Sequence, residues 1–211
     1  MTVTRIDLVR HGHVENPQRK VYGRLPGWRL SAAGRAEATA TATRLRERPI
    51  VRIYTSPLER AQETAAAIAA ACGAPVEIDD ALVESALGAH WEGLEWAEVR
   101  SARFPELDAY LHRPHEVDFV DEPFDALGAR MARALRTIAS RHPGQEVAAV
   151  SHGDPIKAAL CTLQGRPISA LHERRVRTGG LVALELDGAT VRVLEEWEPR
   201  RSPAVKTRTR R

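Results

Sequence analysis

The sequence has little of what marks secreted, membrane-spanning or metal-binding proteins. Its 211 residues include two cysteines, Cys72 and Cys161, each within an alanine-rich helical pattern, which argues against disulfide bonds and cysteine-based metal sites. The longest strongly apolar run, Ala65–Cys72, is far shorter than the roughly 18 residues that a membrane span needs. The first residues contain no hydrophobic secretory segment. We therefore expect a cytoplasmic protein without a membrane partner, in which both cysteines are packing residues.

Net positive charge is lacking outside the C-terminal segment. Arg200–Arg211 contains six basic residues and no acidic residue, and without those six the formal charge of the chain changes from +3 to −3. A basic tail can attract nucleic acid or an anionic membrane. No aromatic residues are interleaved with this one, however, and no nucleic-acid-binding motif accompanies it. We therefore expect no nucleic-acid partner and interpret residues 200–211 as a disordered, solvated tail.

The composition is otherwise that of an ordinary globular domain, with 43% hydrophobic, 28% charged and only 5% aromatic residues. A chain of this length buries one substantial core, so we expect residues 1–199 to form a single domain. Short apolar runs alternate with helical patterns. This alternation predicts an α/β fold, a three-layer α/β/α sandwich with a mostly parallel central sheet.

The boundaries of the elements follow from hydrophobic periodicity and from turn residues. The predicted strands are Thr4–Val9, Val51–Thr55, Val76–Ile78, Glu146–Val150 and a C-terminal hairpin, Gly180–Leu186 with Thr190–Trp197, turning at Asp187-Gly188. The predicted helices are Ser31–Glu47, Ser56–Ala71, Phe124–Arg141 and Asp154–Leu163. The second helix has a capping-box start, with Ser56 as N-cap, proline in the first helical position and Glu59 three residues after the cap.

Residues 85–123 are less regular than the rest of the chain. They are too many for an ordinary connection and contain short helical patterns at Trp96–Arg103 and Pro105–His112. This segment is predicted to be a small helical lid insertion. Trp91 and Trp96 then either pack within the lid or form a hydrophobic wall for a substrate.

Two apolar strands end in the same dipeptide, His11-Gly12 and His152-Gly153. In open α/β sheets, ligands bind beyond the carboxyl ends of the strands, so both histidines are candidate site residues. Arg10 precedes the first histidine and Arg60 lies in the first turns of the helix after the second strand. Two guanidinium groups match the oxygens of a phosphoryl group. The loop residue Asn16 completes this candidate pocket.

Four motifs carry a family resemblance: LVRHGHVEN, TSPLERAQETA, LVESALGAHWEGL and VAAVSHGD, in this order between Ile6 and Leu160. In order and spacing they resemble the histidine phosphatase superfamily, in the branch that includes cofactor-dependent phosphoglycerate mutases and many small-substrate phosphatases. The resemblance implies a nucleophilic His11 that forms a phosphohistidine and a general acid and base, Glu84. It also implies that the phosphoryl oxygens are held by Arg10, Arg60, His152, Asn16 and Gly153.

The implied roles fit the chemistry of these residue types. Two neighbouring arginines lower the pKa of an imidazole below its ordinary value of about 6.5, which keeps His11 neutral and nucleophilic. Fixed donors, including a His152 protonated in the presence of phosphate, stabilise the charge of the phosphoryl transition state. A carboxyl group such as Glu84 gives a proton to the leaving oxygen and later takes one from water. No step requires a metal or another cofactor, because the arginines supply the positive charge.

Several positions depart from the pattern of the family. His13 and Val14 replace its usual acidic or glutamine residue and its hydroxyl residue, and Asn16 lies one position earlier than the usual asparagine. Asp121-Glu122-Pro123 stands in place of the common Gly-Glu-Ser. The long insert of the glycolytic mutases has no counterpart between Glu84 and Phe124. A short lid admits water, which favours hydrolysis of a small phosphorylated metabolite over mutase-type phosphoryl transfer.

The same sequence allows other interpretations. His11 and His13 form an H-x-H pair that could bind a metal, and Cys161 and Arg166 loosely resemble the loop of a cysteine phosphatase, although only four residues separate them. A pocket that binds phosphorylated ligands without turnover is a third alternative.

Tyr22, Gly23 and Arg24 form either a substrate rim or a solvated loop. A homodimer is compatible with the sequence. The histidines interpreted as structural are His90, His112, His115, His142 and His172.

Overall fold

A computed structural model describes residues 3–188 and 190–200, and within them the chain forms one mixed sheet of six strands in the order β3-β2-β4-β1-β5-β6. The strands are β1 Thr4–Arg10, β2 Ile50–Thr55, β3 Val76–Ile78, β4 Glu146–Ser151, β5 Leu181–Asp187 and β6 Thr190–Trp197. The first four are parallel to one another, whereas β5 is antiparallel to β1 and β6 is antiparallel to β5. The predicted α/β fold with a mostly parallel sheet is therefore confirmed.

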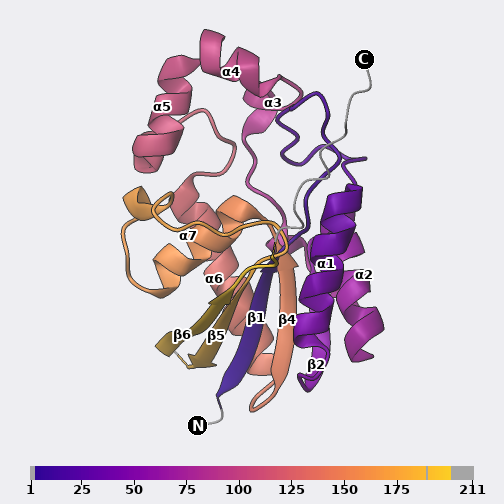
Figure 1. Ribbon diagram of the computed structural model, residues 1–211. Coiled ribbons are helices and arrows are strands. Elements are labelled where there is room, and N and C mark those ends of the chain that lie inside the picture. Colours follow the sequence, from indigo (N-terminus) through magenta and orange to yellow (C-terminus); the bar gives the residue numbers. More distant parts are fainter. Residues whose placement is uncertain (1–2, 189, 201–211) are drawn as a thin grey trace, which may run out of the picture.

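Helices cover both faces of the sheet (Figure 1). One face carries α1 Ala32–Leu45 and α2 Glu59–Cys72, and the other carries α6 Phe124–Arg141 and α7 Gly153–Leu163. Each face has its own hydrophobic core. The α6 helix buries its apolar stripe completely, at Leu127, Met131, Leu135 and Ile138. Burial of such side chains stabilises the fold by about 1.5–3 kcal/mol each.

The central strands bring three segments of the chain to one edge of the sheet. In β1, Ile6, Leu8 and Val9 are fully buried, as expected for a strand covered on both faces. Val9 pairs with Val150 of β4, which in turn pairs with Thr55 of β2. The carboxyl ends of these three parallel strands are therefore level, and the residues that follow them meet above the same edge.

The predicted lid is helical and lies beyond that edge of the sheet, above α7 (Figure 1). It contains α3 Gly88–Trp91, α4 Trp96–Ala102, α5 Phe104–His112 and the 3₁₀ turn η2 Pro114–Glu116. Trp91 is fully buried between the rings of Trp96, Tyr110 and Phe119, and its Nε1 donates to Glu106 at 2.8 Å. Trp91 is therefore the packing centre of the lid. Two further 3₁₀ turns are η1 Asp80–Leu82 and η3 Ile168–Ala170.

Two local predictions were wrong by a few residues. The capping box does not form, because α2 begins at Glu59 after Leu58, and the Ser56 hydroxyl is hydrogen-bonded to His152 at the sheet edge. In the C-terminal hairpin Asp187 pairs with Thr190, so Gly188, with a φ of 57°, takes the first loop position. Glycine adopts such a left-handed conformation without steric cost.

The structure bears on three expectations from composition, which concern membrane spans, the cysteines and the basic tail. Among the described residues, no helix combines the length and the apolar character needed to cross a membrane. Both cysteines are free thiols in helices, with Cys161 buried and Cys72 half-buried. Of the predicted basic tail, residues 201–211 lie outside the described part of the chain.

Candidate active site

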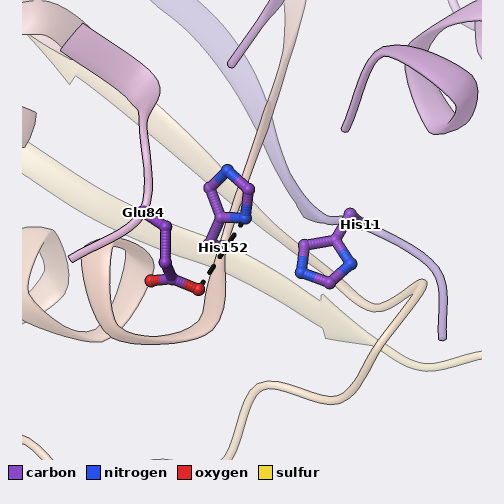
Figure 2. A group of neighbouring side chains, drawn as sticks. All are labelled: His11, Glu84 and His152. Atoms are coloured by element: carbon purple, nitrogen blue, oxygen red, sulfur yellow. Dashed lines mark ion pairs between the residues drawn. The ribbon is translucent and has the colours of Figure 1, made fainter. Parts of the chain in front are cut away.

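The two predicted histidines meet at the carboxyl edge of the sheet. The ring centroids of His11 and His152 are 5.0 Å apart and both rings are buried (Figure 2). Gly12 makes this placement possible, because a Cβ there would lie 2.4 Å from the carbonyl oxygen of Gly34 in α1. The absence of a side chain at Gly12 thus lets the loop after β1 pass against α1.

The hydrogen bonds of His11 fix its tautomer. Its Nδ1 lies 2.7 Å from the carbonyl oxygen of Gly12, which can only accept, so Nδ1 carries the proton and Nε2 carries the lone pair. Burial, Arg60 and Arg10, in that order, hold the pKa of His11 well below its usual value. The arginine effect expected from the sequence has the right direction, but burial is the larger cause. A neutral imidazole with a free Nε2 is a competent nucleophile.

The guanidinium groups of the fully buried Arg60 and the half-buried Arg10 flank the histidines and keep free donors. Arg10 donates from Nη1 to the carbonyl of Val176 at 2.7 Å, and Arg60 donates from Nη2 to the carbonyl of Gly23 at 2.7 Å. Three of their donor atoms, Nε of Arg10 with Nε and Nη1 of Arg60, are buried without a hydrogen-bond partner. An unsatisfied buried donor costs about 1–3 kcal/mol. Phosphoryl oxygens are acceptors that would satisfy such donors.

Gly153 contributes to this pocket by having no side chain beside Arg10. A Cβ at Gly153 would lie 3.2 Å from the guanidinium carbon of Arg10. Glycine therefore leaves room for the guanidinium against the start of α7. The guanidinium carbon of Arg60 is 4.8 Å from the centre of the Tyr22 ring. Tyr22, a predicted rim residue, therefore makes a cation–π contact with Arg60.

His152 lies between His11 and Glu84 (Figure 2). Its Nε2 is 2.7 Å from Oγ of Ser56, and its Nδ1 is 3.7 Å from Oε2 of Glu84, which is too long for a hydrogen bond. Burial holds the pKa of His152 well below its usual value, and Arg60, His11 and Arg10 add to that effect. In the free site His152 is therefore neutral. Its expected protonation depends on the charge of a bound phosphate.

Glu84 has the environment of a proton donor. Its Oε1 accepts hydrogen bonds from the backbone N–H of Ser85 at 2.9 Å and from the Ser85 hydroxyl at 3.3 Å. Burial raises the pKa of Glu84, and the negative charge of Asp154 raises it further, against the opposing effects of Arg60, the Ser85 N–H and Arg10. A raised pKa favours the protonated form of the carboxyl group, which is the form that can give a proton to a leaving group.

A brace that the sequence reasoning missed holds the backbone around Glu84. Arg130 of α6 donates to the carbonyl of Ala81 at 2.6 Å, and Arg24 donates from Nε to the carbonyl of Glu84 at 2.7 Å. Glu122 joins the two arginines, at 2.7 Å from Arg130 and 3.3 Å from Arg24. Arg24 was predicted as a substrate rim residue, but its contacts make it part of this brace. The unusual Asp121-Glu122-Pro123 segment was the available signal.

A cavity of about 230 Å³ opens beside these residues. Tyr22 and Gly23, two of the predicted rim residues, line this cavity, and Trp96 of the lid contributes an aromatic wall. Arg10, Glu84 and Gly153 belong both to the cavity lining and to the site described above. The cavity also contains Asp154 and Tyr110, which the sequence reasoning did not single out.

Asn16 is placed differently from its expected phosphate-binding role. Its Nδ2 donates to the carbonyl of Lys20 at 2.8 Å, and its Oδ1 accepts from the N–H of Lys20 at 2.9 Å. Both ends of the amide therefore close the loop. Within that loop Arg19 has a φ of 52°, the left-handed region that non-glycine residues seldom adopt.

The histidines outside the site have structural partners. His13 is exposed and its Nδ1 lies 2.9 Å from Oγ of Ser31, so it does not pair with His11 as an H-x-H metal site would require. His90 contacts Glu106, His142 contacts Tyr54, and His172 contacts Lys157.

The two metal- and cysteine-based alternatives can be placed in the fold. Within the described residues, the group of three side chains that could hold a metal ion is His11, Glu84 and His152, whose ligand atoms all lie within 4.8 Å of one another. A cysteine phosphatase would need the arginine of its loop to bind phosphate beside the cysteine. Here Arg166 forms an ion pair with Glu173, and Cys161 is packed in the hydrophobic core.

Comparison with known proteins agrees with this geometry. The sequence pattern of the histidine phosphatase superfamily (branch 1) matches residues 6–198. "Uncharacterized protein Rv0525" of Mycobacterium tuberculosis (strain ATCC 25618 / H37Rv) is 40% identical over 182 residues, which cover 86% of this chain and 88% of that protein. The "Metal-independent phosphoserine phosphatase" of Arabidopsis thaliana is 35% identical over 163 residues, 74% of this chain and 67% of that one.

Among solved structures, Bacillus stearothermophilus YhfR superposes with a TM-score of 0.83 at 29% identity, covering 90% of this chain and 95% of that chain. The matched region contains both His-Gly strand ends, Arg60 and Glu84. The family resemblance inferred from the four motifs is thereby confirmed, and the chain belongs to branch 1 of the histidine phosphatase superfamily.

Proposed function

We propose that this protein is a phosphatase that hydrolyses a small phosphomonoester through a covalent phosphohistidine at His11. The observation that carries the proposal is the lone pair on Nε2 of a neutral, buried His11 beside guanidinium donors that have no protein partner. Membership of the histidine phosphatase superfamily supports the same activity class. The curated relative named a metal-independent phosphoserine phosphatase supports hydrolysis without a metal ion.

In the first step, Nε2 of His11 attacks phosphorus and the bond from phosphorus to the ester oxygen breaks. The proton on Glu84 passes to that leaving oxygen, so the alcohol departs neutral. Arg10 and Arg60 hold the equatorial oxygens, where the negative charge of the transition state is spread. Their free donors are already fixed, so little reorganisation accompanies the reaction.

In the second step, the ionised Glu84 takes a proton from a water molecule. The water oxygen attacks phosphorus, the phosphorus–nitrogen bond breaks, and its electron pair returns to Nε2 of His11. The Gly12 carbonyl keeps the proton of His11 on Nδ1 throughout, so the ring is ready for another cycle. Inorganic phosphate then leaves, and Glu84 is again protonated.

The cavity suits a small substrate. Its volume of about 230 Å³ leaves room for a phosphoryl group and a compact alcohol, with Trp96 and Leu87 as apolar walls. O-phosphoserine is therefore the first compound to assay, since a relative that is 35% identical carries that substrate in its name. Mutase-type transfer uses the same chemistry with another acceptor, and it is tested by following isomerisation of 3-phosphoglycerate in parallel.

The test is to trap the phosphorylated enzyme. Wild-type protein mixed rapidly with ³²P-labelled substrate and quenched in alkali should carry label that is stable to base and labile to acid, the signature of a phosphoramidate. His11→Ala should carry none and should lose turnover by at least about 10³-fold. His13→Ala, which alters an exposed ring two residues away, should retain both label and turnover. Label retained by His11→Ala would contradict the proposal.

A further inference from the structure

Asp154 is a buried carboxylate at the reaction cavity that the mechanism above leaves unused. It lies in the first turn of α7, two residues after His152, and it lines the same cavity as Glu84. Carboxylates are rarely buried without a function or a partner. Both carboxyl groups line one cavity of about 230 Å³, so the charge of Asp154 can act on the candidate proton donor.

Two side chains hold Asp154 in its ionised form. The hydroxyl of Tyr110, on lid helix α5, donates to Oδ2 at 2.7 Å, and the ammonium group of Lys157, one turn along α7, lies 2.6 Å from Oδ1. Burial by itself raises the pKa of Asp154, but the charge and hydrogen bond of Lys157 and the Tyr110 hydroxyl outweigh it, so the pKa is lowered. Both carboxylate oxygens are therefore engaged by donors.

Glu84 has the opposite environment. Only its Oε1 accepts hydrogen bonds, both of them from Ser85, and its Oε2 lies 3.7 Å from Nδ1 of His152. Burial and the charge of Asp154 raise its pKa, whereas that of Asp154 is lowered. When one of two neighbouring carboxyl groups is held ionised, the other retains its proton to higher pH.

The charged and titratable groups around Glu84 come from several elements. They are Arg10 and His11 at the end of β1, Arg60 on α2, Tyr22 on the rim loop, Tyr110 on α5, and His152 and Asp154 at the start of α7. Arg24, Glu122 and Arg130 hold the neighbouring backbone, and their charges are paired with one another. Arg60 and Arg10 favour the ionised form of Glu84, and the charge of Asp154 opposes them.

We propose that Asp154 is a positioning residue for the reaction, a fixed anion whose charge keeps the proton on Glu84 until the leaving oxygen takes it. Asp154 itself exchanges no proton, because Tyr110 and Lys157 occupy both of its oxygens. Since Tyr110 lies on α5, the lid contributes one of the two donors that keep Asp154 ionised. The inference rests on the proposed function in assigning Glu84 as the general acid.

The kinetic test compares Asp154→Asn with wild type over a range of pH, using an alkyl ester, O-phosphoserine, and an aryl ester, 4-nitrophenyl phosphate. Loss of the anion should move the alkaline limb of kcat/KM for the alkyl ester to lower pH. The aryl ester should be far less affected, because its leaving group needs little protonation. Asp154→Glu should keep the limb near its wild-type position. A limb unmoved by asparagine, or moved equally by asparagine and glutamate, would overturn the inference.

A second measurement needs no turnover. Titration of the side-chain carboxyl carbon of Glu84 by ¹³C NMR, assigned through the missing signal in Glu84→Gln, reports its protonation in the free protein. The midpoint should move to lower pH in Asp154→Asn and stay in place in Asp125→Asn, which alters an exposed aspartate in the first turn of α6. Asp154→Ser makes the same test if the asparagine variant does not fold.

The two proposals fail in different ways. A wild-type protein that turns over none of the esters would remove the proposed function, while the NMR titration would still measure the effect of Asp154 on Glu84. A Glu84 midpoint unchanged by loss of Asp154 would remove the inference and leave the phosphatase proposal intact.

Discussion

The hydroxyl oxygen of Ser56 lies 2.7 Å from Nε2 of His152, although 96 positions separate the two residues in the chain. A hydroxyl group can donate to a neutral imidazole and can accept from a protonated one. Ser56 can therefore hydrogen-bond the neutral ring of His152 in the free site, and it could also accept a hydrogen bond from a ring that a bound phosphate protonates. This explains why Ser56 does not cap α2.

Replacing Ser56 by alanine should weaken both stability and catalysis. The variant leaves a buried ring nitrogen of His152 without a partner, which costs about 1–3 kcal/mol in the free energy of unfolding. Urea denaturation measures that loss, and kcat should fall along with it. Ser101→Ala is the matched control, because the Ser101 hydroxyl is exposed and binds only the carbonyls of its own helix turn. Equal effects of the two variants would contradict the role given to Ser56.

Arg60→Lys keeps the positive charge but removes the forked donors. Lysine offers a point charge in place of a planar guanidinium, so the hydrogen bonds to two phosphoryl oxygens and to Gly23 cannot all be kept. A charged hydrogen bond contributes about 1.5–3 kcal/mol, so kcat/KM should fall about 10- to 100-fold. Inhibition by vanadate should weaken in parallel.

The control for this variant is Arg29→Lys, at an exposed arginine that pairs with Glu63 on the surface. It should leave kcat/KM and vanadate inhibition near their wild-type values, since surface ion pairs contribute little. An Arg60→Lys enzyme with the kinetics of wild type would remove Arg60 from the phosphate site.

The buried histidines make stability depend on pH. Burial and the arginines lower the pKa of His152 in the folded protein, whereas in the unfolded chain it returns to about 6.5. Below that pH the unfolded chain binds the proton and the folded protein does not, so the free energy of unfolding contributed by His152 falls as pH decreases from about 6.5. Above that pH the contribution is constant.

Urea denaturation at pH 7.5 and pH 5.0 checks this sign. The loss of stability between the two values should be smaller in His152→Asn than in wild type, because the variant has no ring to titrate. His112→Asn, at an exposed ring on α5, should lose as much stability as wild type. A pH dependence unchanged in His152→Asn would show that the ring is not held neutral.

A chelator should leave the phosphatase reaction unaffected. The proposed steps take their positive charge from Arg10 and Arg60. Zinc, however, should inhibit, since His11, Glu84 and His152 offer ligand atoms within 4.8 Å of one another. Glu84→Gln should weaken the binding of zinc to the free protein, because it removes one of the three ligand groups. Activity that a chelator abolishes and zinc restores would favour a metal-dependent hydrolase instead.

The sequence predicted the features that depend on local pattern. The strands predicted at Thr4–Val9 and Glu146–Val150 each extend one residue further in the structure, and the amphipathic helix Phe124–Arg141 has the predicted bounds. These elements were predictable because burial imposes a period on the residues that face the core. The convergence of His11 and His152 followed from a general rule about the edge of parallel sheets. Of the lid helices, α4 and α5 were predicted to within one residue, whereas the short helix α3 and the turn η2 were not predicted.

What the sequence did not predict depends on partners far away in the chain. Ser56 has the pattern of a helix cap, and only its contact with His152 from another strand reveals another use. Asn16 had the right residue type, but its amide is taken by Lys20. The brace formed by Glu122, Arg24 and Arg130 joins three segments that no periodic pattern connects.

The level ends of β1, β2 and β4 restrict how such a protein can change. Loss of one residue within β1 would turn the side chains that follow it, including those of Arg10 and His11, to the side opposite to the one they now face. This follows because neighbouring side chains alternate across a strand. The lid is less restricted, since few of its side chains hold residues of the site, among them Ser85, Tyr110 and Glu122. New substrates can therefore be acquired by exchanging the other lid residues over an unaltered sheet, and laboratory diversification should begin with residues 85–123 other than these three.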